Sequence, residues 1–277
     1  MRSQLVTSPR ALLLAAGMLC GASLACSVRA ETVDCTPVTS LPAVISAQGI
    51  YCLTGNLATS QTSGYAIQIN ANNVTLDLNG WKVGGQAAGS GTGAVGIFST
   101  ANNVTIKNGI VRGFFNGVFL TGRGAVVQDM LIDQNLYFGI RVQGEGSVVE
   151  HNQVVDTGGS TSFTTLNAVG ISADGPGSTV SNNMVSGLTA TGAGHEYGIG
   201  VIGADSTVRD NVVSDTAKPT GGGNSYGIYQ IQSIAVSNTV SNFNIGIYNS
   251  GGIYAHNTAY NCSNPYSGGT AGAGNSP

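Results

Sequence analysis

The chain has 277 residues, of which 42 are glycine and only 8% are charged, and its formal net charge is −3. Average soluble domains contain about 7% glycine and about 25% charged residues. This composition excludes a helical bundle or a coiled coil, which would be rich in Glu, Lys, Arg and Leu. The apolar content of 42% argues against a disordered chain. A glycine-rich fold with an apolar core remains.

The first thirty residues have the pattern of a secretory signal peptide. Two arginines precede an apolar run over residues 11–19, and Val28-Arg29-Ala30 offers small side chains where signal peptidase cleaves. We therefore predict a signal peptide over residues 1–30 and a secreted or periplasmic mature protein. Cleavage before Cys26, which would give a lipoprotein, is the second choice. No stretch of the sequence is long enough to cross a bilayer.

The net charge limits the class of partner. Loss of residues 1–30 removes three arginines and no acid, so the formal charge falls from −3 to −6. Nucleic acid is therefore not expected as a partner, because phosphate binding needs clustered Lys and Arg. We expect a monomer.

Three cysteines remain in the mature chain. Cys35 and Cys52 can form a disulfide in an oxidising compartment and would stabilise the loop between them by roughly 3 kcal/mol. Cys262 is left over, either as a buried thiol or as an intermolecular partner. The spacing of Cys35 and Cys52, without a neighbouring His, is poor for zinc. We predict no metal site and no cofactor.

The main signal is an internal repeat. A Gly-Ile or Gly-Val pair recurs, and about ten residues after several of these pairs comes a second piece of the form V-x-x-N-x-V. The pairs begin at Gly96, Gly117, Gly139, Gly170, Gly198, Gly227 and Gly246, with Ala66-Ile67 as an earlier copy. The Asn of the second piece is Asn152, Asn183, Asn211 and, in a looser match, Asn257.

Each piece alternates apolar and polar residues, which is the period of a half-buried strand. The connections are too brief for crossover helices, so the units must stack as coils about 4.8 Å apart. The aliphatic residue after each Gly then forms an inward ladder. The Asn column fits a stacked turn, where Asn tolerates left-handed backbone and bonds its neighbours.

These coils resemble the parallel β-helix repeats of the right-handed β-helix proteins, the pectate-lyase-like superfamily. The segment from Cys35 to Leu53, followed by Val74-Thr75-Leu76-Asp77-Leu78-Asn79-Gly80, resembles the N-terminal part of secreted bacterial members. The resemblance covers about residues 35–262. It implies an all-β fold, a single-stranded right-handed parallel β-helix of about eight coils with an N-terminal cap.

The domain organisation follows from this resemblance. Residues 31–60 would cap the open end of the solenoid, because an exposed strand edge invites aggregation. Residues 61–262 would form the β-helix. The tail 263–277 consists mainly of small and polar residues without aliphatic side chains, and we expect it to be disordered.

Extra residues precede the Gly-Ile strand in three successive coils, at 158–167, 189–196 and 218–225. Insertions at one corner of a stack would build a wall, which either lines a binding groove or has no function. His195, Glu196 and Lys218 lie near it. The outward column two residues after each Gly contains Phe98, Phe119, Arg141, Ser172, Gly200, Tyr229 and Tyr248.

Aromatic faces stack on sugar rings, and Arg can hold a carboxylate. We therefore predict that Tyr229, Tyr248, Glu196 and Lys218 bind substrate. Phe98 and Phe119 are better explained by cross-strand contacts that protect strand pairing.

A second column places Asp129 and His151 one coil apart, where they could act as a general base. An ordinary solvated surface pair is the alternative. If the protein is an enzyme, the candidate catalytic residues are Arg141, His151, Asp129 and His195. The acid-rich and His-containing motifs of pectate lyases, polygalacturonases and alginate epimerases are absent.

Three hypotheses remain. The first is a secreted β-helix protein that binds a polysaccharide along its looped face without evident catalysis. The second is a polysaccharide lyase or uronate epimerase. The third is a structural or adhesive cell-surface protein, for which Cys262 and the tail could serve attachment.

Overall fold

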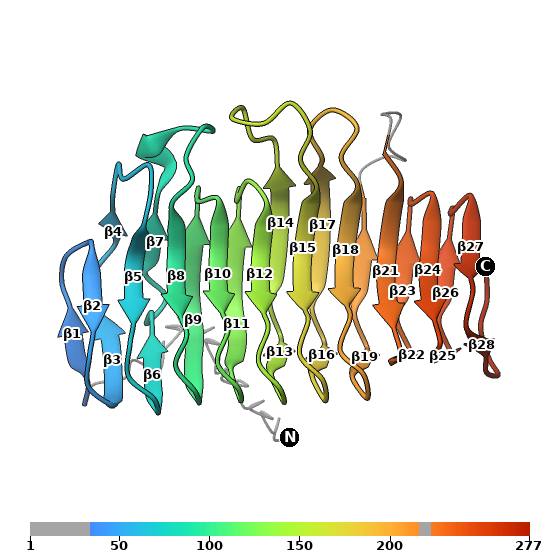
Figure 1. Cartoon of the computed structure of the whole chain (residues 1–277), viewed down its shortest axis with the longest axis horizontal. Helices are drawn as coiled ribbons and strands as arrows, with labels where there is room; N and C mark the ends of the chain where they lie inside the picture. The colour runs from blue at the N-terminus through green and yellow to red at the C-terminus, as the bar shows by residue number, and fades with distance from the viewer. Residues whose placement is uncertain (1–33, 216–222) are drawn as a thin grey trace, which may run out of the picture.

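A computed structural model describes residues 34–215 and 223–277, and its strands form two parallel sheets that run the length of a solenoid (Figure 1). The predicted signal peptide, Cys26 and Lys218 lie outside these residues. The 10-stranded sheet contains β2 (Ala43–Ile45), β5 (Tyr65–Ile69), β8 (Val95–Ser99), β10 (Asn116–Leu120), β12 (Phe138–Val142), β15 (Ala168–Ala173), β18 (Glu196–Val201), β21 (Ser225–Ile231), β24 (Ile245–Ser250) and β27 (Asn264–Ser267).

The 18-stranded sheet is folded into two rows. The first row is β1 (Thr36–Val38), β3 (Gly49–Leu53), β6 (Val74–Asp77), β9 (Val104–Arg112), β11 (Val126–Asp133), β13 (Val148–Glu150), β16 (Thr179–Ser181), β19 (Thr207–Arg209), β22 (Ile234–Val236), β25 (Ile253–Ala255) and β28 (Thr270–Ala271). The second row is β4 (Leu57–Ala58), β7 (Lys82–Gly84), β14 (Gln153–Gly158), β17 (Met184–Thr189), β20 (Val212–Ser214), β23 (Thr239–Ser241) and β26 (Thr258–Tyr260). The long strands β9 and β11 pair in both rows. The described part of the chain contains one 3-10 helix, η1 (Gln86–Ala88), and no α-helix.

The fold class is the predicted one, a right-handed parallel β-helix. The eight repeat starts read from the sequence lie in β5, β8, β10, β12, β15, β18, β21 and β24, and the 10-stranded sheet continues by β2 at one end and β27 at the other.

The aliphatic ladder forms the core. Ile140 pairs with Val118 on one side and with Ile171 on the other, and all three side chains are fully buried. The same register runs from Ile97 to Ile247. The Gly before each aliphatic residue is required by packing: a Cβ on Gly139 would lie 2.5 Å from Cγ1 of Val154 and 2.6 Å from the carbonyl oxygen of Gly170. Gly lets the 10-stranded sheet approach the second row this closely.

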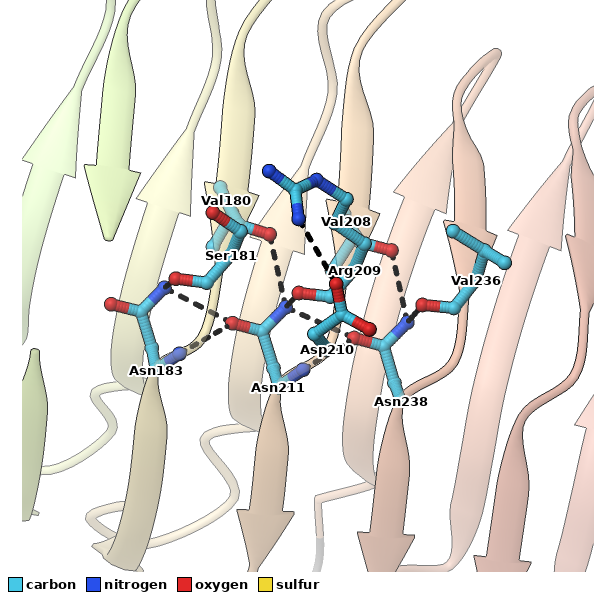
Figure 2. Close-up of polar contacts among 9 residues, drawn as sticks. All are labelled: Val180, Ser181, Asn183, Val208, Arg209, Asp210, Asn211, Val236 and Asn238. Carbon is cyan, nitrogen blue, oxygen red and sulfur yellow. Dashed lines mark hydrogen bonds and ion pairs between the residues drawn. The ribbon is translucent and has the colours of Figure 1, made fainter. Parts of the chain in front are cut away.

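A buried ladder of asparagines joins successive coils (Figure 2). The Oδ1 of Asn211 accepts hydrogen bonds from the backbone N–H and the Nδ2 of Asn183, at 2.9 and 3.0 Å. The Nδ2 of Asn211 donates to the carbonyls of Val180 and Arg209 and to Oδ1 of Asn238. The ladder extends from Asn152 through Asn183, Asn211, Asn238 and Asn257 to Asn275. The structural interpretation of the Asn column is confirmed.

The backbone conformation that we predicted for the ladder is wrong by one residue. The left-handed residue is the one before each ladder Asn, as in Asn182 (φ 56°) and Asp210 (φ 57°). This position leaves the side chain in solvent and turns the chain between the two rows. The ladder Asn itself is buried, and its amide donates to backbone carbonyls of its own coil and of the preceding coil.

Both ends of the chain join the solenoid. Residues 34–60 form strands that pair in register with later coils, and Cys35 and Cys52 form the predicted disulfide, with Cα atoms 5.8 Å apart. The prediction of a disordered tail is wrong, because β27 and β28 extend the sheets and Asn275 continues the ladder. The tail has no aliphatic side chains, and it is held instead by backbone strand pairing and by the hydrogen bonds of Asn275. Cys262 is a half-buried thiol, with Sγ 3.5 Å from the carbonyl oxygen of Tyr260.

We expect Asn211→Ala to destabilise the fold by about 2–4 kcal/mol, because it leaves buried polar groups of the neighbouring coils without partners. Asp210→Gly, next to it, should change stability by less than about 0.5 kcal/mol, since that side chain is on the surface and Gly adopts the left-handed conformation freely. Urea unfolding of both variants measures the difference. Equal losses would show that the ladder contributes no more than the surface turn.

Candidate functional site

Long connections gather at one edge of the solenoid (Figure 1). The predicted loops 158–167 and 189–196 lie side by side, with an antiparallel bridge between Leu166 and Thr191. The connection that contains η1 lies at the same edge, and the Oγ of Ser162 donates to the carbonyl of Gly91 at 2.7 Å. This fourth loop was not predicted as part of the wall. Only residues 223–225 of the third predicted loop are described.

The outward side of the 10-stranded sheet carries the column of residues two positions after each Gly, in the predicted register. Phe119 pairs with Phe98 and Arg141, and Tyr229 pairs with Gly200 and Tyr248. We call the outward side of this sheet the outer face. It adjoins the looped edge, because the loops lead directly into its strands.

Four tyrosines pack together on the outer face. Tyr229 and Tyr248 stack with ring centroids 4.9 Å apart and planes 9° apart, and Tyr197 and Tyr226 stack at 5.2 Å and 5°. The two pairs meet edge to face, with Tyr226 and Tyr229 at 5.4 Å. Tyr197 and Tyr226 belong to a second outward column, one residue before the Gly, which the sequence reading missed. The repeated Tyr-Gly-Ile at 197–199 and 226–228 was the available signal.

Two of these tyrosines have raised pKa values. Burial raises the pKa of the Tyr197 hydroxyl above its ordinary value of 10.0, and the neighbouring Tyr226 and Tyr229 add to this. Burial also raises the pKa of Tyr229, with a further contribution from Tyr248. Tyr197 and Tyr229 therefore offer apolar ring faces and neutral hydroxyls at physiological pH.

A cavity of about 300 Å³ opens in the outer face beside the tyrosines. We call it the slot. Tyr197 and Tyr229 lie at one end and Phe138 and Arg141 at the other, while the small residue Gly200 lines it between them. Ser172 and Gly200 are the small members of the outward column, and their size leaves this space.

Arg141 is held rigidly at the edge of the slot. Its guanidinium carbon lies 4.7 Å from the ring centroid of Phe138 and 5.4 Å from that of Phe119. Its Nε and Nη2 donate to Oδ2 of Asp174, at 3.1 and 3.0 Å. Asp174 also accepts from Gln143 and, at 2.6 Å, from the hydroxyl of Ser172. Asp174 was not among the predicted site residues, because it lies outside the repeated Gly-Ile pattern.

The predicted base pair lies elsewhere. Asp129 is in β11 and His151 follows β13, so both belong to the 18-stranded sheet, and both are exposed with φ of 55°. No hydrogen bond or ion pair joins them among the described residues; Asp129 instead accepts from Gln128. The two residues lie one coil apart, as predicted, because they directly follow the paired residues Gln128 and Glu150. Their role as a general base stays a prediction. Their column is the left-handed turn, and Asn, Asp and His are the residues that such positions favour.

His195 lies at the looped edge, with its ring 6.1 Å from Tyr197 and 6.4 Å from Tyr226. Its Nδ1 accepts a hydrogen bond from the backbone N–H of Asn224 at 2.9 Å. In the neutral imidazole this bond assigns the proton to Nε2, so the remaining nitrogen is a donor. The geometry fits a role in joining loops better than the predicted catalytic role.

Glu196 is 8% exposed, and its predicted role in substrate binding stays a prediction. Its Oε1 accepts from the backbone N–H of Ala190 at 3.1 Å, and its Oε2 is buried without a hydrogen bond in the described part of the chain. Burial raises the pKa of this carboxyl, the Ala190 bond lowers it, and the negative charge of Asp215 raises it further.

Among the described residues, no group of three or more His, Cys, Asp or Glu side chains is placed to hold a metal ion. No helix within the described ranges is long and apolar enough to cross a membrane.

No protein-family model and no curated protein matches the sequence. Among solved structures, the Dettilon tailspike protein (gp208) has a TM-score of 0.62 at 16% identity, over 86% of this chain and 51% of that one. The enzymatically active domain of bacteriophage CBA120 tailspike protein 2 has a TM-score of 0.53 at 13% identity, over 78% and 38%. Pectate lyase Pel9A has a TM-score of 0.45 at 12% identity, over 87% and 71%.

The two tailspike structures establish the fold. The chain is a parallel β-helix, as predicted. It spans about half the length of the Dettilon tailspike protein.

The buried carboxyl predicts a pH dependence of stability. The pKa of Glu196 is above 4.5 in the folded state, so its ionisation destabilises the fold: the cost is absent at low pH and grows as the pH rises through the folded-state pKa. We expect Glu196→Gln to raise Tm at pH 8 relative to pH 4, each compared with the wild type. Glu145→Gln, at an exposed position, should show no such trend. A Tm difference for Glu196→Gln that does not vary with pH would contradict this account.

Proposed function

We propose that the protein binds a polysaccharide along the outer face of the 10-stranded sheet, beside the looped edge. The observation that carries this proposal is the cluster of four stacked tyrosines next to a cavity that contains Arg141. Aromatic faces pack against the apolar faces of sugar rings, and hydroxyls and amides at their edges bond sugar hydroxyls.

The rigidity of the face supports binding. Each tyrosine is braced by a neighbour on the next coil, and the coils are fixed by parallel pairing on both sides. Side chains that are already ordered lose little conformational entropy when a ligand binds.

Several observations favour binding over the lyase or epimerase alternative. Arg141 is already paired with Asp174, and His195 has its acceptor nitrogen occupied. Asp129 and His151 belong to a different sheet from Arg141. The residues predicted for catalysis are therefore not assembled around one cavity.

We further propose that the protein works outside the cytoplasm, as the sequence of residues 1–30 predicts. The Cys35–Cys52 disulfide supports this, since disulfides persist in oxidising compartments. The monomeric state remains a prediction.

Binding can be tested with a panel of neutral and acidic polysaccharides in affinity electrophoresis and calorimetry. We expect Tyr229→Ala and Tyr248→Ala each to weaken binding by about 5- to 30-fold, the effect of losing an aromatic anchor worth about 1–2 kcal/mol. Tyr260→Ala is the matched control, because Tyr260 is 67% exposed on β26, in the other sheet.

The outcomes separate the hypotheses. Binding that is lost in the Tyr229 and Tyr248 variants but kept in the Tyr260 variant supports the proposal. A rise in ultraviolet absorbance from unsaturated sugars during incubation with uronate polysaccharides would instead establish a lyase. Absence of both binding and turnover would overturn the proposal and favour a structural or adhesive role.

A further inference from the structure

The slot differs in shape from the rest of the outer face. Its ends are Arg141 and Tyr229, which are three coils apart in the same outward column, or about 14 Å at the usual strand spacing. Ser172 and Gly200 occupy the two coils between them. A volume of about 300 Å³ is at the small end of ligand cavities, so the slot has room for a single sugar ring.

Gly200 has no positive φ that would require glycine, but the absence of its side chain leaves the slot open. It is one of the few buried glycines without positive φ at which an added Cβ would meet nothing closer than 4.0 Å, the distance to the carbonyl oxygen of Ile171. Gly198, two residues earlier, shows the opposite case, because its Cβ would lie 2.5 Å from the carbonyl oxygen of Gly227. A larger side chain at Gly200 would fill the slot without disturbing the coil.

The charges around the slot cancel. Of the described residues that line it, Arg141 and Asp174 carry charge, and they form an ion pair at 3.0 Å with side chains that are 29% and 18% exposed. A guanidinium that already holds a carboxylate has little attraction left for a second one, because the net charge that an approaching anion meets is close to zero.

The slot still has hydrogen-bond donors without a partner in the described chain. Within the described chain, no hydrogen bond is made by the Nη1 of Arg141 or by the Nδ2 of Asn167, whose Oδ1 accepts from His195 at 2.8 Å. Tyr197 and Tyr229 also line the cavity. Donors beside an aromatic wall match a ring that carries hydroxyl groups.

From the closed Arg141–Asp174 pair and the space over Gly200 we propose that the slot binds one neutral sugar residue of the polysaccharide and selects against its uronic acid counterpart. This inference rests on the proposed function and names its substrate class. The sugar ring stacks on Tyr229, and its hydroxyls face Arg141 and Asn167.

The test uses neutral polysaccharides, each beside its C6-oxidised form, which has the same backbone and an added carboxylate. The probes are amylose, laminarin and galactomannan. We expect the wild type to bind a neutral form at least about fivefold more tightly than its oxidised form, with little dependence on salt.

Two variants examine the slot itself. Gly200→Leu should weaken binding of the neutral form by at least about tenfold, while Gly55→Leu, at a bend where an added Cβ also meets nothing within 4 Å, should leave it unchanged. Asp174→Asn leaves Arg141 without its counter-ion. It should therefore shift the preference toward the oxidised form by about fivefold or more, with an increased dependence on salt. Circular dichroism and Tm confirm that each variant is folded.

Failure of this inference is distinguishable from failure of the proposed function. If Tyr229→Ala abolishes binding but Gly200→Leu does not, or if the oxidised forms bind the wild type more tightly, the slot inference is overturned and polysaccharide binding stands. If the wild type binds none of the probes nor any member of the wider panel, both proposals are overturned.

Discussion

The constraint on which the structure depends is the parallel register between successive coils. Each residue in a paired strand lies directly above its equivalent in the previous coil, at the spacing of paired strands, about 4.8 Å. The nearest neighbours of its side chain are therefore the residues at the same position in the coils before and after it. Inside, this produces the aliphatic ladder from Ile97 to Ile247; at the turn between the two rows, it produces the asparagine ladder. The low charge of the chain follows from it, since like charges in one column would repel at this distance.

The same register explains why the outer face can be a binding surface. A column of tyrosines on adjacent coils stacks without any further support, as Tyr229 and Tyr248 do. Replacing a large residue by a small one in the column opens a cavity of defined width, because the neighbours above and below cannot move to fill it. Gly200 and Ser172 do this between Arg141 and Tyr229. On a solenoid, a binding cavity can therefore arise where a small residue interrupts a column of larger ones.

The fold could be predicted from the sequence because its coils repeat and resemble known parallel β-helix repeats. Positions that repeat in type, such as the Gly-Ile pairs, were placed in the correct register. The tail was mispredicted because β27 and β28 join the sheets through backbone hydrogen bonds, which leave no aliphatic pattern. Asn275 extends the ladder without any flanking Val, so its role became visible only with the coil in place.

Only those residues of the candidate site that belong to a repeated column could be predicted from the sequence. Tyr229 and Tyr248 belong to a repeated column, so their register could be predicted, whereas Asp174 contributes through one ion pair with a residue on another coil, which no repeat encodes. The column of Asp129 and His151 shows how a structural pattern can resemble acid–base chemistry, because the recurrence of Asn, Asp and His there accompanies a left-handed backbone. In a stacked fold, recurrence in a column is therefore evidence of a structural requirement. The residues that interrupt a column, such as Gly200 between larger neighbours, are the ones for which a functional explanation is needed.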